Sequence, residues 1–182
     1  MGGGANSPLF TADIKINGFI HVAGIAQFSA IKHFSIKQSE KMFRINVFSA
    51  CEIIRILSSK GYKKYLEYII FLSSIAAHRG YKIMSLYGAS KASLCALSRS
   101  LSIELAPITR VNSIVLGGIR TSGTEFLYTE DFSQRMQEIY PLGQGNISDI
   151  ANLVDFLCNA KSRWISGQNI FIDGGLSNLG HS

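Results

Sequence analysis

Apolar runs and stretches of helical periodicity alternate along the chain. Four short runs are nearly continuous in apolar residues and end at polar residues or glycine, which is typical of buried parallel strands. They cover residues 18–22, 68–72, 111–116 and 168–172. Three longer stretches repeat apolar residues every three or four positions, which predicts helices over residues 39–59, 87–106 and 150–158. This alternation predicts an α/β fold: a parallel sheet with helices on both of its faces.

The composition favours one folded domain. The chain has 182 residues, of which 47% are apolar and 16% charged, so it can bury a core. Its apolar runs are too short for a membrane span, and the N-terminal residues do not resemble a signal peptide. They also miss the myristoylation pattern, because position six is Asn6 rather than Ser or Thr. A soluble, cytoplasmic protein is therefore expected. Residues 1–13 lack periodicity and are predicted to be a flexible tail, and residues 14–182 to be the domain.

Charge and cysteine usage exclude some classes of function. The net charge is +6, but the clustered Lys60, Lys63 and Lys64 lie close to Glu67, and no arginine-rich tract is present. We therefore expect no nucleic-acid partner. The histidines show no spacing typical of metal ligands, so no metal is expected. The cysteines form no CxxC pair and lie among apolar neighbours, so they are expected to be buried free thiols. They are Cys51, Cys95 and Cys158.

The candidate chemistry is a tyrosine–lysine pair on the second predicted helix. Tyr87 and Lys91 lie four residues apart, so their side chains share one helix face. A cation beside a phenol lowers the pKa of the phenol, which suits proton exchange with a carbonyl or an alcohol. Ser74 ends the strand upstream and can hydrogen-bond the same oxygen. Taken alone, the pair could also be structural, and Ser74 could simply cap the next segment.

Several ordered motifs resemble the short-chain dehydrogenase/reductase family. The spacing of Ser74, Tyr87 and Lys91 is one of them, and five other segments follow the family's order over about residues 14 to 176. These are HVAG (21–24), INV (45–47), VNSIVLGGIRT (111–121), PLGQGNISDIA (141–151) and GQNIFIDGG (167–175). The resemblance implies a Rossmann-like sheet and an NAD(P)-dependent oxidoreductase that interconverts a carbonyl and an alcohol, for example a 3-oxoacyl carrier protein reductase. It leaves NAD and NADP undistinguished.

The resemblance also implies a role for each site residue. Tyr87 would be the acid or base, Lys91 would lower its pKa and hold the nicotinamide ribose, Ser74 would polarise the carbonyl, and Asn46 would relay protons through water. An isolated Asn46 could equally be a structural residue of a packed helix. The cofactor-binding residues would be Ala23, Gly24, Tyr87, Lys91, Gly117, Ile119 and Thr121.

The chain departs from the family pattern at three points. His21 and Val22 replace two asparagines, which predicts weaker polar contacts there, and Leu116 replaces a proline.

The segment 122–140 corresponds to the family's substrate lid. Its aromatic residues suggest an apolar or ring-shaped substrate, or simply pack the lid on the domain. They are Phe126, Tyr128, Phe132 and Tyr140.

The family's first strands and glycine-rich turn have no counterpart in residues 1–13, where no strand precedes the glycines. The sheet is therefore expected to lack the first strands of the full fold. We interpret the chain as a fragment of a longer reductase; alternatives are a partner that supplies the missing half, or a cofactor-binding-deficient relative that acts as a binding or assembly module. The resemblance further implies a homo-oligomer formed through the two long helices.

Overall fold

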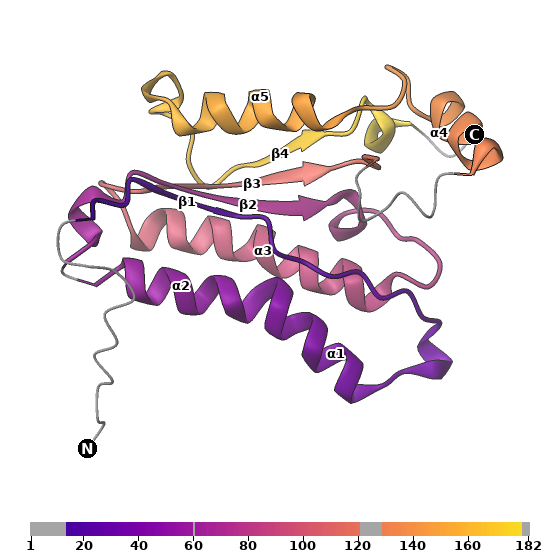
Figure 1. Ribbon diagram of the computed structural model, residues 1–182, viewed down its shortest axis with the longest axis horizontal. Coiled ribbons are helices and arrows are strands. Elements are labelled where there is room, and N and C mark those ends of the chain that lie inside the picture. Colours follow the sequence, from indigo (N-terminus) through magenta and orange to yellow (C-terminus); the bar gives the residue numbers. More distant parts are fainter. Residues whose placement is uncertain (1–13, 60, 121–128, 180–182) are drawn as a thin grey trace.

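The sheet of this protein is parallel and four-stranded in the part of the chain that the structure describes. The structure is a computed structural model that describes residues 14–59, 61–120 and 129–179. The strands are β1 (Gly18–His21), β2 (Tyr68–Ser74), β3 (Arg110–Leu116) and β4 (Asn169–Ile172), in spatial order β1-β2-β3-β4 (Figure 1). Each predicted strand is confirmed to within two residues. The predicted tail, residues 1–13, lies outside the described residues.

The pairing register aligns the carboxyl ends of the strands. His21 pairs with Phe71, Ser74 with Leu116, and Leu116 in turn with Ile172. Because all strands run the same way, the residues that follow them meet at one edge of the sheet.

The three predicted helices are present, with one interruption in the first of them and one further helix, α4 (Glu130–Ile139), that the periodicity did not predict. The stretch expected to be one helix over residues 39–59 is α1 (Ile36–Phe43) and α2 (Ser49–Leu57), joined by a π-helical turn (Arg44–Phe48). The periodicity predicted one continuous helix and did not reveal this turn, since π-helical turns occur inside α-helices without ending them. The other helices are α3 (Ser85–Glu104), α4 (Glu130–Ile139) and α5 (Ile147–Cys158). Asn146 caps α5 by accepting hydrogen bonds from the Ser148 and Asp149 amides.

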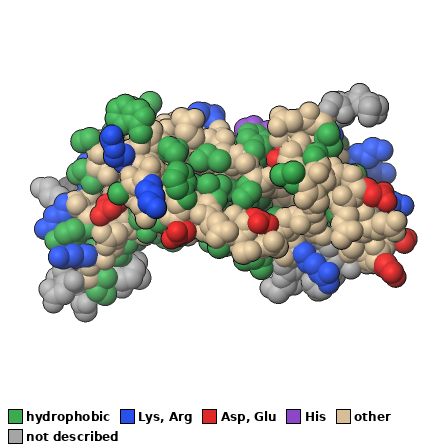
Figure 2. Space-filling view, turned by 90° about the horizontal axis from the view of Figure 1, so that it is seen from above, with side chains coloured by type: hydrophobic (Ala, Val, Ile, Leu, Met, Phe, Trp, Pro, Cys, Tyr) green, Lys and Arg blue, Asp and Glu red, His purple; other side chains and the backbone are tan. Residues whose placement is uncertain are grey.

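Both faces of the sheet carry helices, as predicted. Along β2, Ile69 and Phe71 point toward α2 and α3, whereas Ile70 points toward Leu157 of α5. This alternation is the period-two geometry of a strand. In Figure 1 the three helices α1, α2 and α3 lie on one side of the sheet and α5 on the other. Figure 2 views the α5 side, where hydrophobic side chains gather in the middle of the surface.

Small side chains let α3 approach the sheet closely. Ser90 and Ser98 are fully buried on α3, and a Cβ on Gly88 would stand 2.4 Å from the Ala76 carbonyl oxygen. The buried thiol expected at Cys95 is confirmed, and Cys158 is half-buried. Cys51 is exposed, so the prediction that it is buried was wrong: it faces outward from α2, while Ala50 and Ile54 face the core.

A close aromatic contact on β1 generates a prediction about stability. The ring of Tyr68 lies across Gly18, so a Cβ there would stand 1.9 Å from the nearest ring carbon. Gly18→Ala is therefore expected to lower the free energy of unfolding by about 1–3 kcal/mol, through overpacking. Urea unfolding of the two proteins measures this difference.

Gly61→Ala is the matched control, because a Cβ at Gly61 has no atom within 4 Å. That variant is expected to be neutral or slightly stabilising, since alanine reduces the freedom of the unfolded chain. Equal losses in the two variants would refute the steric explanation.

Candidate functional site

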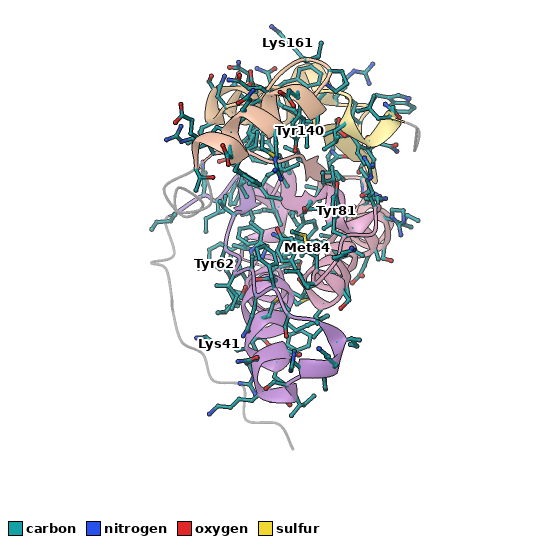
Figure 3. The ribbon with its side chains drawn as sticks, turned by 90° about the vertical axis from the view of Figure 1, so that its right-hand side faces the viewer. Lys41, Tyr62, Tyr81, Met84, Tyr140 and Lys161 are labelled. Atoms are coloured by element: carbon teal, nitrogen blue, oxygen red, sulfur yellow. The ribbon has the colours of Figure 1, made fainter. Side chains whose placement is uncertain are left out.

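The candidate site lies at the carboxyl edge of the sheet, where the segments after β1, β2 and β3 meet the N-terminal half of α3. Figure 3 views the molecule from this side, with Tyr140 above Tyr81 and Met84. Parallel α/β sheets bind their ligands at this edge, because loops and helix ends converge there. The sequence-predicted residues Ser74, Tyr87 and Lys91 are all found here.

Lys91 is a buried ammonium held at the end of β2. Its side chain comes from α3, is 7% exposed, and donates a hydrogen bond from Nζ to the Leu72 carbonyl oxygen at 2.9 Å. Burial lowers the pKa of Lys91 to about 8. The amine thus remains largely protonated at neutral pH, but it is close enough to its pKa to lose the proton in mild alkali.

Tyr87 lies one helical turn before Lys91 and is half-buried. Burial raises the pKa of the Tyr87 phenol, and a hydrogen bond with the Ser74 side chain partly opposes this rise. The expectation that Lys91 lowers the pKa of Tyr87 was wrong for this structure. The ammonium lies 5.9 Å from the centre of the phenol ring and is directed to the Leu72 carbonyl, so desolvation dominates.

Ser74 has the capping role that was considered for it, whereas its role on a substrate oxygen stays a prediction. Its hydroxyl accepts a hydrogen bond from the Ala76 amide at 3.2 Å and thereby caps the short turn that follows β2. The same side chain is the hydrogen-bonding partner of Tyr87. Capping therefore fixes the hydroxyl beside the phenol.

Asn46 lies in the π-helical turn and is completely buried. Its side-chain oxygen accepts from the Ile25 amide at 2.8 Å, and its side-chain nitrogen donates to the Ile25 carbonyl and to Ser90 Oγ, both at 3.0 Å. The amide thus links the segment after β1 to α3, one residue before Lys91. The side chain is engaged in structure, as the alternative for an isolated asparagine proposed, and it lies within the site.

Two residues that the motifs did not single out also support the site. Ser73 donates from Oγ to the Lys91 carbonyl oxygen at 2.9 Å and accepts from the Cys95 thiol at 3.2 Å. Phe28 packs edge-to-face on Tyr87, with ring centres 5.9 Å apart. A polar residue at an inward position of an apolar strand was the available signal for Ser73; Phe28 had none, because its loop lacks periodicity.

His21 makes a polar contact within the protein that the sequence did not predict. Its imidazole Nε2 lies 2.9 Å from the Asn46 carbonyl oxygen, to which it donates. Sequence position alone could not show this contact, since the two residues are 25 apart and come together only when β1 lies against the π-helical turn.

The residues present fit one end of a nicotinamide dinucleotide. A Cβ on Gly24 would stand 3.2 Å from Lys91 Nζ and 3.5 Å from Asn46 Oδ1, so the bare backbone after β1 leaves room beside the ammonium. Among the described residues, no strand runs into a GxxxGxG turn that could cradle a pyrophosphate. The described residues thus offer space beside the Lys91 ammonium but no pyrophosphate cradle.

The loop after β3 is tightly built. A Cβ on Gly117 would stand 2.9 Å from the Asp173 Cα, and the Gly118 amide donates to the Tyr140 hydroxyl. Ile119 lies beside Gly145, and Thr121 lies outside the described residues. Ala23 is exposed next to Gly24.

The aromatic residues of the predicted lid were expected either to contact an apolar substrate or to pack the lid on the domain. Tyr140 is buried in the cluster that contains Ile75, Cys95 and Val115, so it packs the end of α4 on the domain. Phe132 on α4 stays partly exposed. Phe126 and Tyr128 lie outside the described residues.

Two classes of site receive no support from the part of the chain that the structure describes. Its helices do not combine the length and apolar character needed to cross a bilayer. Within the same residues, histidines, cysteines and carboxylates do not gather in threes as metal ligands would.

Comparisons with known proteins agree with this geometry. The sequence model of the family described as "Enoyl-(Acyl carrier protein) reductase" matches residues 11–177. The chain is 30% identical over 169 residues to a 3-oxoacyl-[acyl-carrier-protein] reductase of Buchnera aphidicola, a match that covers 92% of this chain and 67% of the relative. It is 31% identical over 137 residues to 7alpha-hydroxysteroid dehydrogenase of Escherichia coli, covering 74% of this chain and 54% of that enzyme.

Solved structures give the same result. A short-chain dehydrogenase/reductase of Brucella melitensis superposes with a TM-score of 0.78 at 31% identity, covering 89% of this chain and 65% of that one. A 4-hydroxyisoleucine dehydrogenase complexed with NADH superposes with a TM-score of 0.83 at 25% identity, covering 90% of this chain and 69% of that one. The chain thus spans roughly two thirds or less of the length of the curated relatives it matches.

The burial of Lys91 generates a prediction about pH. Because the folded pKa is about 8 against an ordinary 10.5, the unfolded chain binds the Lys91 proton more tightly. Folding stability is therefore expected to rise as pH increases from about 8 to 10.5, by about 3 kcal/mol at most. Lys91→Met should lack this rise and should be the more stable protein at pH 7.

Urea unfolding of both proteins across this pH range isolates the effect, because the other titrating groups are common to both. A parallel pH dependence in the two proteins would show that the ammonium is not desolvated.

Proposed function

Because the chain belongs to the short-chain dehydrogenase/reductase family, we propose that it interconverts a carbonyl and an alcohol with NAD or NADP as the cofactor. The observation that carries this proposal is the meeting of Tyr87, Ser74 and Lys91 at the carboxyl edge of a parallel sheet. A phenol, a hydroxyl and an ammonium in this arrangement can serve a single substrate oxygen. The names of the relatives make a 3-oxoacyl-type ketone the first substrate class to examine.

The residues of this chain would handle the proton. Tyr87 is protonated at neutral pH, since its pKa is raised, so it suits the role of the acid that protonates the carbonyl oxygen during reduction. Ser74, held by its capping bond, would donate a hydrogen bond to the same oxygen. In the direction of oxidation Tyr87 must first lose its proton, so alkaline pH would favour that direction. The cofactor would supply or accept the hydride, for which proteins have no side chain.

The cofactor would be held by residues on the same edge. Lys91 is proposed to contact the nicotinamide ribose, beside the bare backbone of Gly24. Asn46 is proposed to relay protons through a water molecule. Its side chain is bonded to Ile25 and Ser90, and its carbonyl oxygen accepts from His21 but keeps a second lone pair. The remaining cofactor-binding residues proposed are Ala23, Gly117, Ile119 and Thr121.

Three free cysteines agree with a reducing compartment, and we propose that the protein is located in the cytoplasm.

A second proposal concerns assembly: a homo-oligomer formed through α2 and α3. Phe48, directly before α2, and Ile53, on α2, are exposed. On α3, the exposed residues Ala89 and Ala96 have small side chains. Apolar and small exposed residues on long helices are typical of subunit contacts. This surface would also serve the alternative function, a module that assembles without binding a dinucleotide.

Removing one hydroxyl tests the catalytic proposal. Tyr87→Phe is expected to lower the rate of ketone reduction by about 100- to 10,000-fold, because the proton donor is lost. Its affinity for NADH and NADPH is expected to fall much less than the rate, because Tyr87 is only one of the proposed cofactor-binding residues. Cofactor absorbance measures the rate, and calorimetric titration measures the affinity.

Tyr65→Phe is the control, because Tyr65 precedes the amino end of β2, away from the site. Equal turnover by the Tyr87→Phe variant would contradict the proposal. If the parent protein binds neither dinucleotide, the assembly module becomes the better account.

The assembly proposal predicts a mass in solution of at least twice that of one chain. Ile53→Lys is expected to shift the protein toward the monomer, since it places a charge on the exposed face of α2. Ile147→Lys makes the same change on α5, across the sheet, and should leave the mass unchanged. Light scattering after size-exclusion chromatography measures this, and a monomeric parent protein would refute it.

A further inference from the structure

His21 is a buried imidazole next to the site that the proposed mechanism does not use. It ends β1, and its side chain is 3% exposed. Its Nε2 lies 2.9 Å from the Asn46 carbonyl oxygen. Because a carbonyl oxygen accepts only, Nε2 must carry the hydrogen.

The surroundings of His21 disfavour a second proton. Phe19 on its own strand and Phe71 on β2 are its ring neighbours, with ring centres 5.9 and 6.3 Å away. The charged group that faces it is Lys91 from α3. Burial first, and then the Lys91 charge, lower the pKa of His21 below 6.5, although the bond to Asn46 opposes them. The ring is therefore neutral at pH 7, with Nδ1 unprotonated.

The bond to Asn46 reaches the site through a chain of contacts. The same asparagine holds both backbone groups of Ile25 and donates to Ser90 Oγ. Ser90 in turn donates to the Tyr87 carbonyl oxygen at 2.8 Å and precedes Lys91. His21 thus lies at one end of a polar connection that ends on the helical turn carrying both candidate site residues.

We propose that His21 is a positioning residue of this site: its neutral imidazole, with hydrogen on Nε2, holds the π-helical turn at Asn46 against the end of β1 and so seats the Tyr87–Lys91 turn of α3. The positioning itself is a property of the fold. Only its consequence for turnover rests on the proposed function.

The proposal has a defined pH dependence. Since the folded pKa of His21 lies below 6.5, the unfolded chain takes up its proton first as pH falls. Stability is therefore lost as pH falls from about 6.5 toward the lowered pKa.

Two variants separate the hydrogen bond from the shape of the ring. His21→Gln keeps an N–H donor at a similar reach without a titrating group, and His21→Phe fills the space without a donor. In His21→Phe, the backbone amides of residues 44–48 and of the α3 turn at 87–91 should exchange hydrogen about fivefold to a hundredfold faster at pH 7. His21→Gln should stay near the parent rate and should lose the fall in melting temperature between about pH 6.5 and 5.

Nitrogen NMR of the unmutated protein tests the tautomer without relying on a variant that folds. The expected spectrum shows a neutral His21 with hydrogen on Nε2 at pH 7, and a Lys91 resonance that shifts a second time when His21 titrates. A hydrogen on Nδ1, unchanged exchange in His21→Phe, or equal losses in both variants would each overturn the proposal. None of these readouts requires nucleotide or turnover, so the proposed function could fail while this inference holds.

Discussion

A buried ammonium at the end of a parallel strand is the constraint on which this site depends. Lys91 has given up most of its water, and a carbonyl oxygen of β2 replaces part of that hydration at 2.9 Å. A buried charge lowers the stability of the folded state, and for the same reason burial lowers the pKa of Lys91 to about 8. The surrounding structure must therefore hold α3 in one position relative to the sheet.

Short polar side chains do this holding. Ser73 bonds the Lys91 carbonyl from β2, and Asn46 bonds Ser90 from the π-helical turn. Buried hydroxyls and amides are costly when left unpaired, so each bond also fixes a direction. Glycine and serine along α3 permit the close approach that these short side chains require. The site is thus assembled by close packing around these short side chains.

The π-helical turn connects these features to the segment after β1. A continuous α-helix would place Asn46 about 100° away from its present direction for each residue of shift. The wider turn lets one residue face Ile25, Ser90 and, through its carbonyl, His21. Such turns are frequent at functional sites because they expose backbone groups that a regular helix would satisfy internally.

Much of the fold followed from the sequence. Strand and helix periodicities are local, and they predicted the parallel sheet, the helices on both faces and the order of the elements. The four-residue spacing placed Tyr87 and Lys91 on one helix face, and Ser74 at the strand end was predicted because ligand-binding edges of parallel sheets follow from chain direction. The roles of these residues stay predictions. The burial of Cys51 was mispredicted, since an amphipathic stripe leaves its margins undecided.

By itself, the sequence determined which residues could exchange a proton and on which elements they stand, since these depend on spacings of a few residues. Tertiary structure alone decided how those groups are tuned. The raised pKa of Tyr87, the lowered pKa of Lys91 and the His21–Asn46 bond all arise from neighbours distant in the chain. Desolvation and hydrogen bonding depend on what folding brings within a few ångströms, and no local pattern encodes that.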